Sequence, residues 1–168
     1  PRHVRVAHVP AGEHPLQDLR LGGANPGIAQ DGRRLLRLLQ GRPLCYDGAF
    51  ARCEQVLAAA LPEAARLLGE ESLQVLRASS ELGLSLVRQG RLQPGLETLE
   101  RASLTFVERW DDDRNHASRN DFGLNLALGH LLAGDPAGAF DGLLRHGVDA
   151  TLVRRVPGLR ALADDPPL

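Results

Sequence analysis

Apolar side chains recur along most of this chain at the three- and four-residue intervals of an amphipathic helix. From residue 28 onward the apolar positions are mostly leucine and alanine, and glycine or proline interrupts them at intervals. This period predicts helices that bury one face each. The predicted helices cover residues 28–41, 49–69, 71–90, 93–110, 115–134, 135–147, 150–156 and 158–166. Residues 49–69 form either one long helix or two, because Pro62 ends or kinks a helix.

Several residues fit the beginning or the end of a predicted helix. Gly90 and Gly134 follow the last apolar positions of two helices, where glycine readily takes the left-handed backbone conformation of a helix end. Asp113, Asp135 and Asp149 each precede a helical segment, and an aspartate there caps the first free N–H groups. These signals place most of the turns between the helices.

Residues 1–27 lack the helical pattern. The segment HVRVAHV alternates like a short strand or an extended arm, and PAGEHP and LGGANPG interrupt any helix. This part is either an arm that packs on its neighbours or the end of a linker from an upstream domain. The expected organisation is an N-terminal arm or linker at residues 1–27 and a helical domain at residues 28–168.

One stretch of the pattern occurs twice. Residues 82–102, LGLSLVRQGRLQPGLETLERA, align without a gap to residues 126–146, LALGHLLAGDPAGAFDGLLRH, at an offset of 44 residues. Gly90 then matches Gly134, and Gly95 matches Ala139. A weaker copy spans residues 34–55, with Gly41 at the turn. Repeated pairs of antiparallel helices predict a solenoid in which each pair covers the apolar face of the next.

This repeat resembles the tetratricopeptide repeat, in the long variant of the kinesin light chains. In that family a Leu–Gly or Leu–Ala pair lies in the first helix, a turn glycine follows seven residues later, and a small residue comes five beyond it. Leu82-Gly83 and Leu126-Ala127 fit the pair, and Asn125 stands where the long variant often has Asn. The resemblance implies an all-α, right-handed superhelix of about three hairpins, at residues 28–68, 71–110 and 114–147, with a capping helix at 149–164.

The resemblance also implies a binding surface. The first helices of tetratricopeptide hairpins line a concave groove that holds peptides, and an Asn at the position of Asn125 hydrogen-bonds the ligand backbone. Arginine suits acidic groups there, because its planar guanidinium binds a carboxylate through two N–H groups; the alternative is that these arginines are only a solvated helix face. The residues expected to face the groove are Arg77, Ser80, Leu84, Arg88, Asp121, Leu124, Asn125, Leu128 and Leu132.

Composition narrows the classes of function. The 168 residues suffice for one well-filled core, and aromatic residues, at 4%, are too few for a typical β-rich core. The net charge of −1 argues against a general nucleic-acid affinity. All 20 basic residues are arginines, which is typical of a GC-rich bacterial genome. No segment is apolar enough for a membrane span or a signal peptide, so the expected location is the cytoplasm.

Candidate chemistry is sparse. The stretch AGDPAG lacks the preceding strand and the lysine of a phosphate loop, and the acidic segment WDDDRN lacks an EF-hand pattern. The six histidines show no zinc spacing. Cys45 and Cys53 do not make a disulfide scaffold, and a reducing cytoplasm is the simpler interpretation. We therefore expect no cofactor, no metal and no enzymatic activity.

The sequence leaves several functions open. A protein- or peptide-binding module fits the predicted groove best. Alternatives are a sensor or regulatory segment of a larger bacterial transcriptional regulator or nucleotide-switch ATPase, and a self-association module in which unpaired hairpin faces form a homodimer. Enzymatic activity is the weakest of the alternatives, because no nucleophile–base pair is marked in the sequence.

Overall fold

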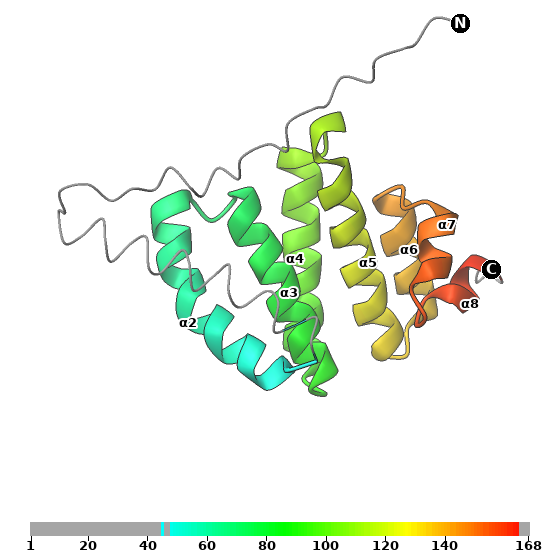
Figure 1. Ribbon diagram of the computed structural model, residues 1–168, viewed down its shortest axis with the longest axis horizontal. Coiled ribbons are helices and arrows are strands. Elements are labelled where there is room, and N and C mark those ends of the chain that lie inside the picture. The colour runs from blue at the N-terminus through cyan, green and yellow to red at the C-terminus, as the bar shows by residue number, and fades with distance from the viewer. Residues whose placement is uncertain (1–44, 46–47, 165–168) are drawn as a thin grey trace, which may run out of the picture.

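Helices follow one another side by side in chain order in the computed structural model (Figure 1). It describes residue 45 and residues 48–164, so the predicted arm at 1–27 and the predicted helix at 28–41 lie outside the described residues. The described part is all-α and contains no strand. Its elements are α2 (Phe50–Leu68), α3 (Leu73–Arg88), α4 (Leu92–Trp110), the 3₁₀ turn η1 (Asp113–Asn115), α5 (His116–Leu132), α6 (Pro136–Arg145), α7 (Ala150–Arg155) and α8 (Arg160–Asp164).

Glycine ends the helices where the sequence predicts it. Gly90 has a φ of 81° and Gly134 a φ of 80°, a backbone conformation that other residues rarely adopt. The residue after each glycine donates its N–H to a carbonyl five residues earlier, at 3.0 and 2.9 Å. This pattern satisfies the free carbonyls at the ends of α3 and α5 and turns the chain into the next helix.

The N-terminal caps confirm two predictions and correct a third. Asp135 and Asp149 each accept a backbone N–H from the first turn of the following helix, at 2.9 and 2.7 Å. Between α4 and α5 the cap is Asp112, not Asp113, because Asp112 accepts two backbone N–H groups of the η1 turn at 3.0 and 3.1 Å. The chain enters a 3₁₀ turn before α5, so the cap comes one residue earlier than the apolar pattern indicates.

Two antiparallel hairpins, α3–α4 and α5–α6, form the middle of the molecule, with α2 against α3 and with α5 against both α3 and α4. In the first hairpin, α3 and α4 approach each other closely at two glycines of the repeat, Gly83 and Gly95. A Cβ atom added to Gly95 would lie 2.8 Å from the carbonyl oxygen of Gly83, which is closer than Cβ atoms approach other heavy atoms in proteins. The equivalent residues of the second hairpin, Ala127 and Ala139, are fully buried. Small residues at these positions therefore allow close helix packing in both hairpins.

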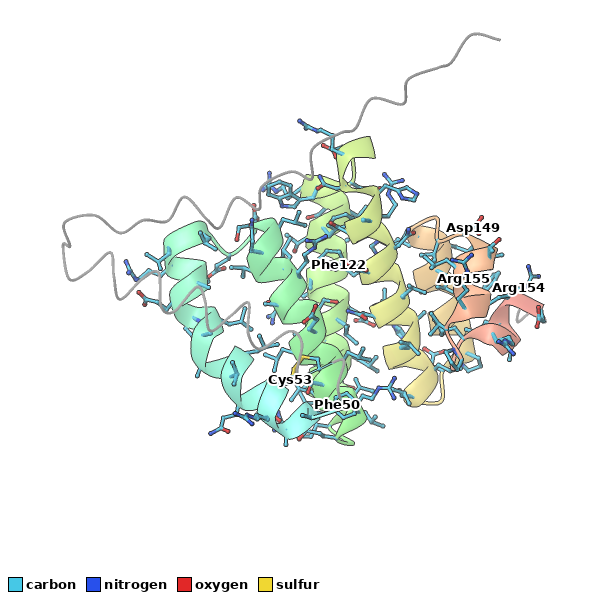
Figure 2. The ribbon with its side chains drawn as sticks, in the orientation of Figure 1. Phe50, Cys53, Phe122, Asp149, Arg154 and Arg155 are labelled. Atoms are coloured by element: carbon cyan, nitrogen blue, oxygen red, sulfur yellow. A yellow bond between two sulfur atoms is a disulfide. The ribbon has the colours of Figure 1, made fainter. Side chains whose placement is uncertain are left out.

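The structure joins the two cysteines in a disulfide. Cys45 is bonded to Cys53, with Cα atoms 5.3 Å apart, and Cys53 lies near the beginning of α2 (Figure 2). Gly48, with a φ of 80°, lies between them in the sequence. This finding differs from the sequence-based expectation, which took the two cysteines as typical of a reducing cytoplasm.

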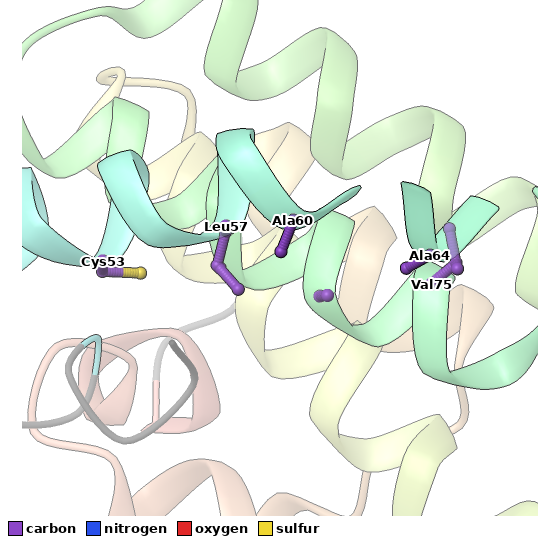
Figure 3. Close-up of a cluster of buried hydrophobic side chains, with 6 residues drawn as sticks. Cys53, Leu57, Ala60, Ala64 and Val75 are labelled. Atoms are coloured by element: carbon purple, nitrogen blue, oxygen red, sulfur yellow. The ribbon is translucent and has the colours of Figure 1, made fainter. Parts of the chain in front are cut away.

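The core of the described residues is divided into clusters along the array and is rich in alanine and leucine. Between α2 and α3, one buried cluster contains Cys53, Leu57, Ala60 and Ala64 of α2 with Val75 of α3, which lies near Ala64 (Figure 3). The α2 helix continues through Pro62, so the predicted segment is one helix. No described helix is both long enough and apolar enough to cross a membrane.

The second hairpin is joined to the first by aromatic packing. Phe106 of α4 and Phe122 of α5 stack with ring centres 4.5 Å apart, and both are fully buried. The ring of His146, at the end of α6, lies 6.0 Å from Phe106 and 6.5 Å from Phe122. Three helices from two hairpins thus share one packed centre.

Candidate functional site

Polar side chains gather where α3 and α5 lie against each other. They come from positions three or four residues apart on each helix, so they share one face of it. We call this set the polar seam: Arg77, Ser80 and Glu81 of α3 with Ser118, Asp121 and Asn125 of α5.

Two hydrogen bonds join the helices across the polar seam. The Nη2 of Arg77 donates to the Oγ of Ser118 at 2.6 Å, and the Nδ2 of Asn125 donates to the Oγ of Ser80 at 3.2 Å. The same Arg77 nitrogen lies 3.9 Å from the carboxylate of Asp121. The seam therefore holds α3 and α5 in register while it keeps polar groups at one surface.

The polar seam is partly open to solvent and carries a negative charge. The side chains of Arg77 and Asp121 are 29% and 48% exposed, whereas Ser80, Glu81 and Ser118 are buried. One guanidinium faces two carboxylates, which gives a formal charge of −1 when all three are ionised. The hollow between them measures only about 10 Å³. A ligand at the seam would therefore lie across its surface.

The other five predicted groove residues lie apart from the polar seam. Leu84 packs against the buried leucines of α4 and α5, and Leu124 and Leu128 pack against the cluster that includes residues of α7 and α8. The guanidinium carbon of Arg88 lies 5.5 Å from the centre of an aromatic ring in α2. Leu132 is exposed at the end of α5. The structure thus brings together four of the nine, namely Arg77, Ser80, Asp121 and Asn125.

Sequence reasoning missed Glu81, which lies in the middle of the polar seam. The offset of 44 residues places Glu81 opposite Asn125 in the repeat, and this equivalence was the signal that could have identified it. Two arginines of α3 and α5 are engaged within the fold. Arg119 binds the carboxylate of Asp111, and Arg77 is held by the seam itself. These side chains stabilise the array, which leaves fewer guanidinium groups for an acidic ligand.

A serine and a histidine form a second polar pair, deep in the core. The Oγ of Ser103 in α4 lies 2.6 Å from the Nε2 of His146, the spacing of a nucleophile and a general base. Both residues are only 1% exposed. No substrate reaches the pair in this arrangement, so the hydrogen bond joins the two hairpins and is not a candidate active site.

Burial controls the charge of His146. Loss of solvation, together with the positive charges of Arg145 and Arg119, lowers the pKa of His146 to about 4, although the carboxylate of Asp111 acts in the opposite direction. The Nδ1 of the ring is buried without a hydrogen-bond partner among the described residues. The imidazole is therefore neutral at pH 7.

The glycine-rich stretch AGDPAG is a helix joint. Asp135 in this stretch caps α6. The hydrogen bond from the N–H of Gly138 is the main cause that lowers the pKa of the Asp135 carboxyl, and the hydrogen bond with His130 lowers it as well. The His130 ring lies between two carboxylates, 3.0 Å from Asp135 and 3.4 Å from Glu100. In the part of the chain that the structure describes, no group of three or more acidic, histidine or cysteine side chains is arranged to hold a metal ion.

Comparison with known proteins adds no assignment. The chain matches no protein-family model, and the searches of curated proteins and of solved structures found no match for it. The all-α class of the described residues is established by the fold. The resemblance to tetratricopeptide repeats stays a prediction from the sequence.

Proposed function

We propose that this chain is a helical-hairpin binding module, similar to a tetratricopeptide array, which holds an extended segment of a protein or peptide partner across the polar seam. The observation that carries the proposal is the meeting of α3 and α5 at a half-exposed polar strip. In tetratricopeptide arrays these would be the first helices of consecutive hairpins. The order of helix contacts and the small residues at repeat-equivalent positions support the same arrangement.

The chemistry of the polar seam favours a ligand that donates hydrogen bonds. The amide nitrogen of Asn125 is used by Ser80, so its Oδ1 is the atom that can accept a backbone N–H from a peptide. The half-exposed carboxylate of Asp121 adds a negative charge beside it. A partner segment with a basic residue suits this charge better than the acidic ligand that the number of arginines indicates.

The predicted cytoplasmic location belongs to the proposal and has an argument against it. Disulfides persist mainly in oxidising compartments, and the structure pairs Cys45 with Cys53. Counting free thiols in protein that was alkylated inside cells before lysis tests the location. Two alkylated cysteines support the cytoplasm, and none supports an oxidising compartment.

Selection of short peptides from a random library against the full chain, followed by calorimetry, tests the binding site. We expect basic peptides among those selected, and we expect Asn125→Ala and Asp121→Asn each to weaken their binding about tenfold. Arg88→Ala is the matched control, because Arg88 belongs to the predicted groove but lies outside the polar seam. Equal affinity in the two seam variants and the wild type would refute the assignment.

A further inference from the structure

A groove runs over α3 on the side away from the polar seam. It measures about 580 Å³ and has α2 and α4 as its walls. Its apolar lining includes Leu61, Val75, Leu76 and Leu82. On α4 it extends from Thr98 to Thr105, which corresponds to about 10 Å, or two helical turns. A second helix of about two turns matches this length.

Two charged side chains line the groove without partners of their own. The side chains of Arg101 in α4 and of Glu70, in the loop after α2, make no hydrogen bond or ion pair with any described residue. Arg101 stands one turn before Thr105, and Glu70 lies at the end of the groove where α3 begins. An apolar groove with a free cation along one wall and a free anion at one end discriminates between partners by charge.

The chain itself carries a helix with the complementary pattern. On α6, Ala137, Asp141 and Leu144 are exposed at i, i+4 and i+7, and Leu144 is 63% exposed. Phe140 and Arg145 flank them on the same face. The side chains of Asp141 and Arg145 make no hydrogen bond or ion pair with the described residues, so both charges are free to meet a partner.

We propose that the groove over α3 binds α6 of a second copy of this chain. With α6 running in the direction of α4, Asp141 meets Arg101, and Arg145, one turn later, meets Glu70. Leu144 and Ala137 then enter the apolar floor. This interaction surface goes beyond the proposed peptide-binding function, because it uses the opposite side of α3 and a different partner.

The contact joins two different surfaces, so it is heterologous. Each copy that is bound through its groove still presents a free α6, and the association therefore extends into open chains unless the rotation closes a ring. A two-turn helix in a short groove buries a small area, and such interfaces are weak. The average molecular mass in solution should therefore rise gradually with protein concentration and should not reach a plateau at the mass of a dimer.

Analytical ultracentrifugation of the full chain, in buffer free of reducing agents and at concentrations from about 10 µM to 500 µM, tests the proposal. We expect the average mass of the wild type to rise over this range. Arg101→Glu and Asp141→Arg should each weaken the association at least about tenfold, because each places like charges together. An equimolar mixture of the two variants should recover it, because the changed groove then faces the changed α6.

The mixture separates a specific contact from a general effect of charge or folding. Arg52→Glu is the matched control, since Arg52 lies on α2, is exposed and does not line the groove. A wild type that remains monomeric throughout overturns the proposal. So does equal association in the single variants, loss of association in Arg52→Glu, or a mixture that stays monomeric while each variant keeps the wild-type circular dichroism.

Discussion

Acid should destabilise this protein through one buried histidine. His146 is 1% exposed and its pKa is lowered to about 4, whereas a histidine in an unfolded chain titrates near 6.5. Between these two values the unfolded chain binds a proton that the folded chain does not, so stability falls as the pH falls. Protonation would also give both ring nitrogens an N–H, and no described residue accepts a hydrogen bond from Nδ1.

The size of the effect follows from the two pKa values. A difference of about 2.5 units between the folded and unfolded values corresponds to about 3 kcal/mol of unfolding free energy lost once the pH is below 4. The loss is already about 2 kcal/mol at pH 5 and is almost absent at pH 7.5. The charges of Arg145, Arg119 and Asp111 act on the ring, so substitutions at these positions would shift the pH range over which stability is lost.

Urea unfolding followed by circular dichroism, at pH 7.5 and pH 5.0, measures this loss. The comparison is His146→Gln, which keeps a neutral polar group beside Ser103 and does not titrate. The wild type should lose about 2 kcal/mol more than the variant between the two pH values. Ser103→Ala retains the buried imidazole and should keep the pH dependence. A His146 resonance that titrates near 6.5 in the folded protein, or an equal loss in wild type and His146→Gln, would refute the reasoning.

Three further predictions concern the packing and the disulfide. Gly95→Ala should lower the unfolding free energy by about 1–3 kcal/mol in urea titrations, because its Cβ would meet the backbone of Gly83; a neutral or stabilising effect would contradict the close approach. Phe106→Ala should cost about 3–5 kcal/mol in the same assay, since it empties the aromatic centre between the hairpins, and a loss below 1 kcal/mol would show that the site collapses. Reduction of the Cys45–Cys53 bond should cost about 2.5 kcal/mol by the chain-entropy argument, and an unchanged urea midpoint after reduction would show that the bond does not constrain the unfolded chain.

The helices were predictable from the sequence because their signals are local. Gly90 and Gly134 end α3 and α5 through their own backbone freedom, and the apolar period of each segment lies within one helix. The cap at Asp112 was missed by one residue because a 3₁₀ turn follows it, and three consecutive aspartates give no local signal to separate them.

The candidate site was predictable only in part, because its members come from two helices. The repeat offset places α3 and α5 in equivalent positions, and four predicted residues of these helices lie together at the polar seam. The partners of each arginine could not be read from spacing: Arg77 is held by Ser118, and Arg119 by an aspartate before α5. The disulfide was missed because a separation of eight residues in the sequence does not show that the two Cα atoms lie 5.3 Å apart.

The two proposed surfaces use opposite sides of α3, and this makes them separable by experiment. Arg77 and Glu81 face the polar seam, whereas Leu76 and Leu82 line the groove. At 100° per residue these two pairs point to different sides of the helix. Because Arg101 lies on α4 and lines the groove but not the hollow of the polar seam, Arg101→Glu should prevent self-association and leave peptide binding unchanged. Asn125→Ala should weaken peptide binding and leave self-association unchanged. A variant that changes both properties equally would show that α3 transmits a structural change between its two sides, and that the surfaces do not act independently.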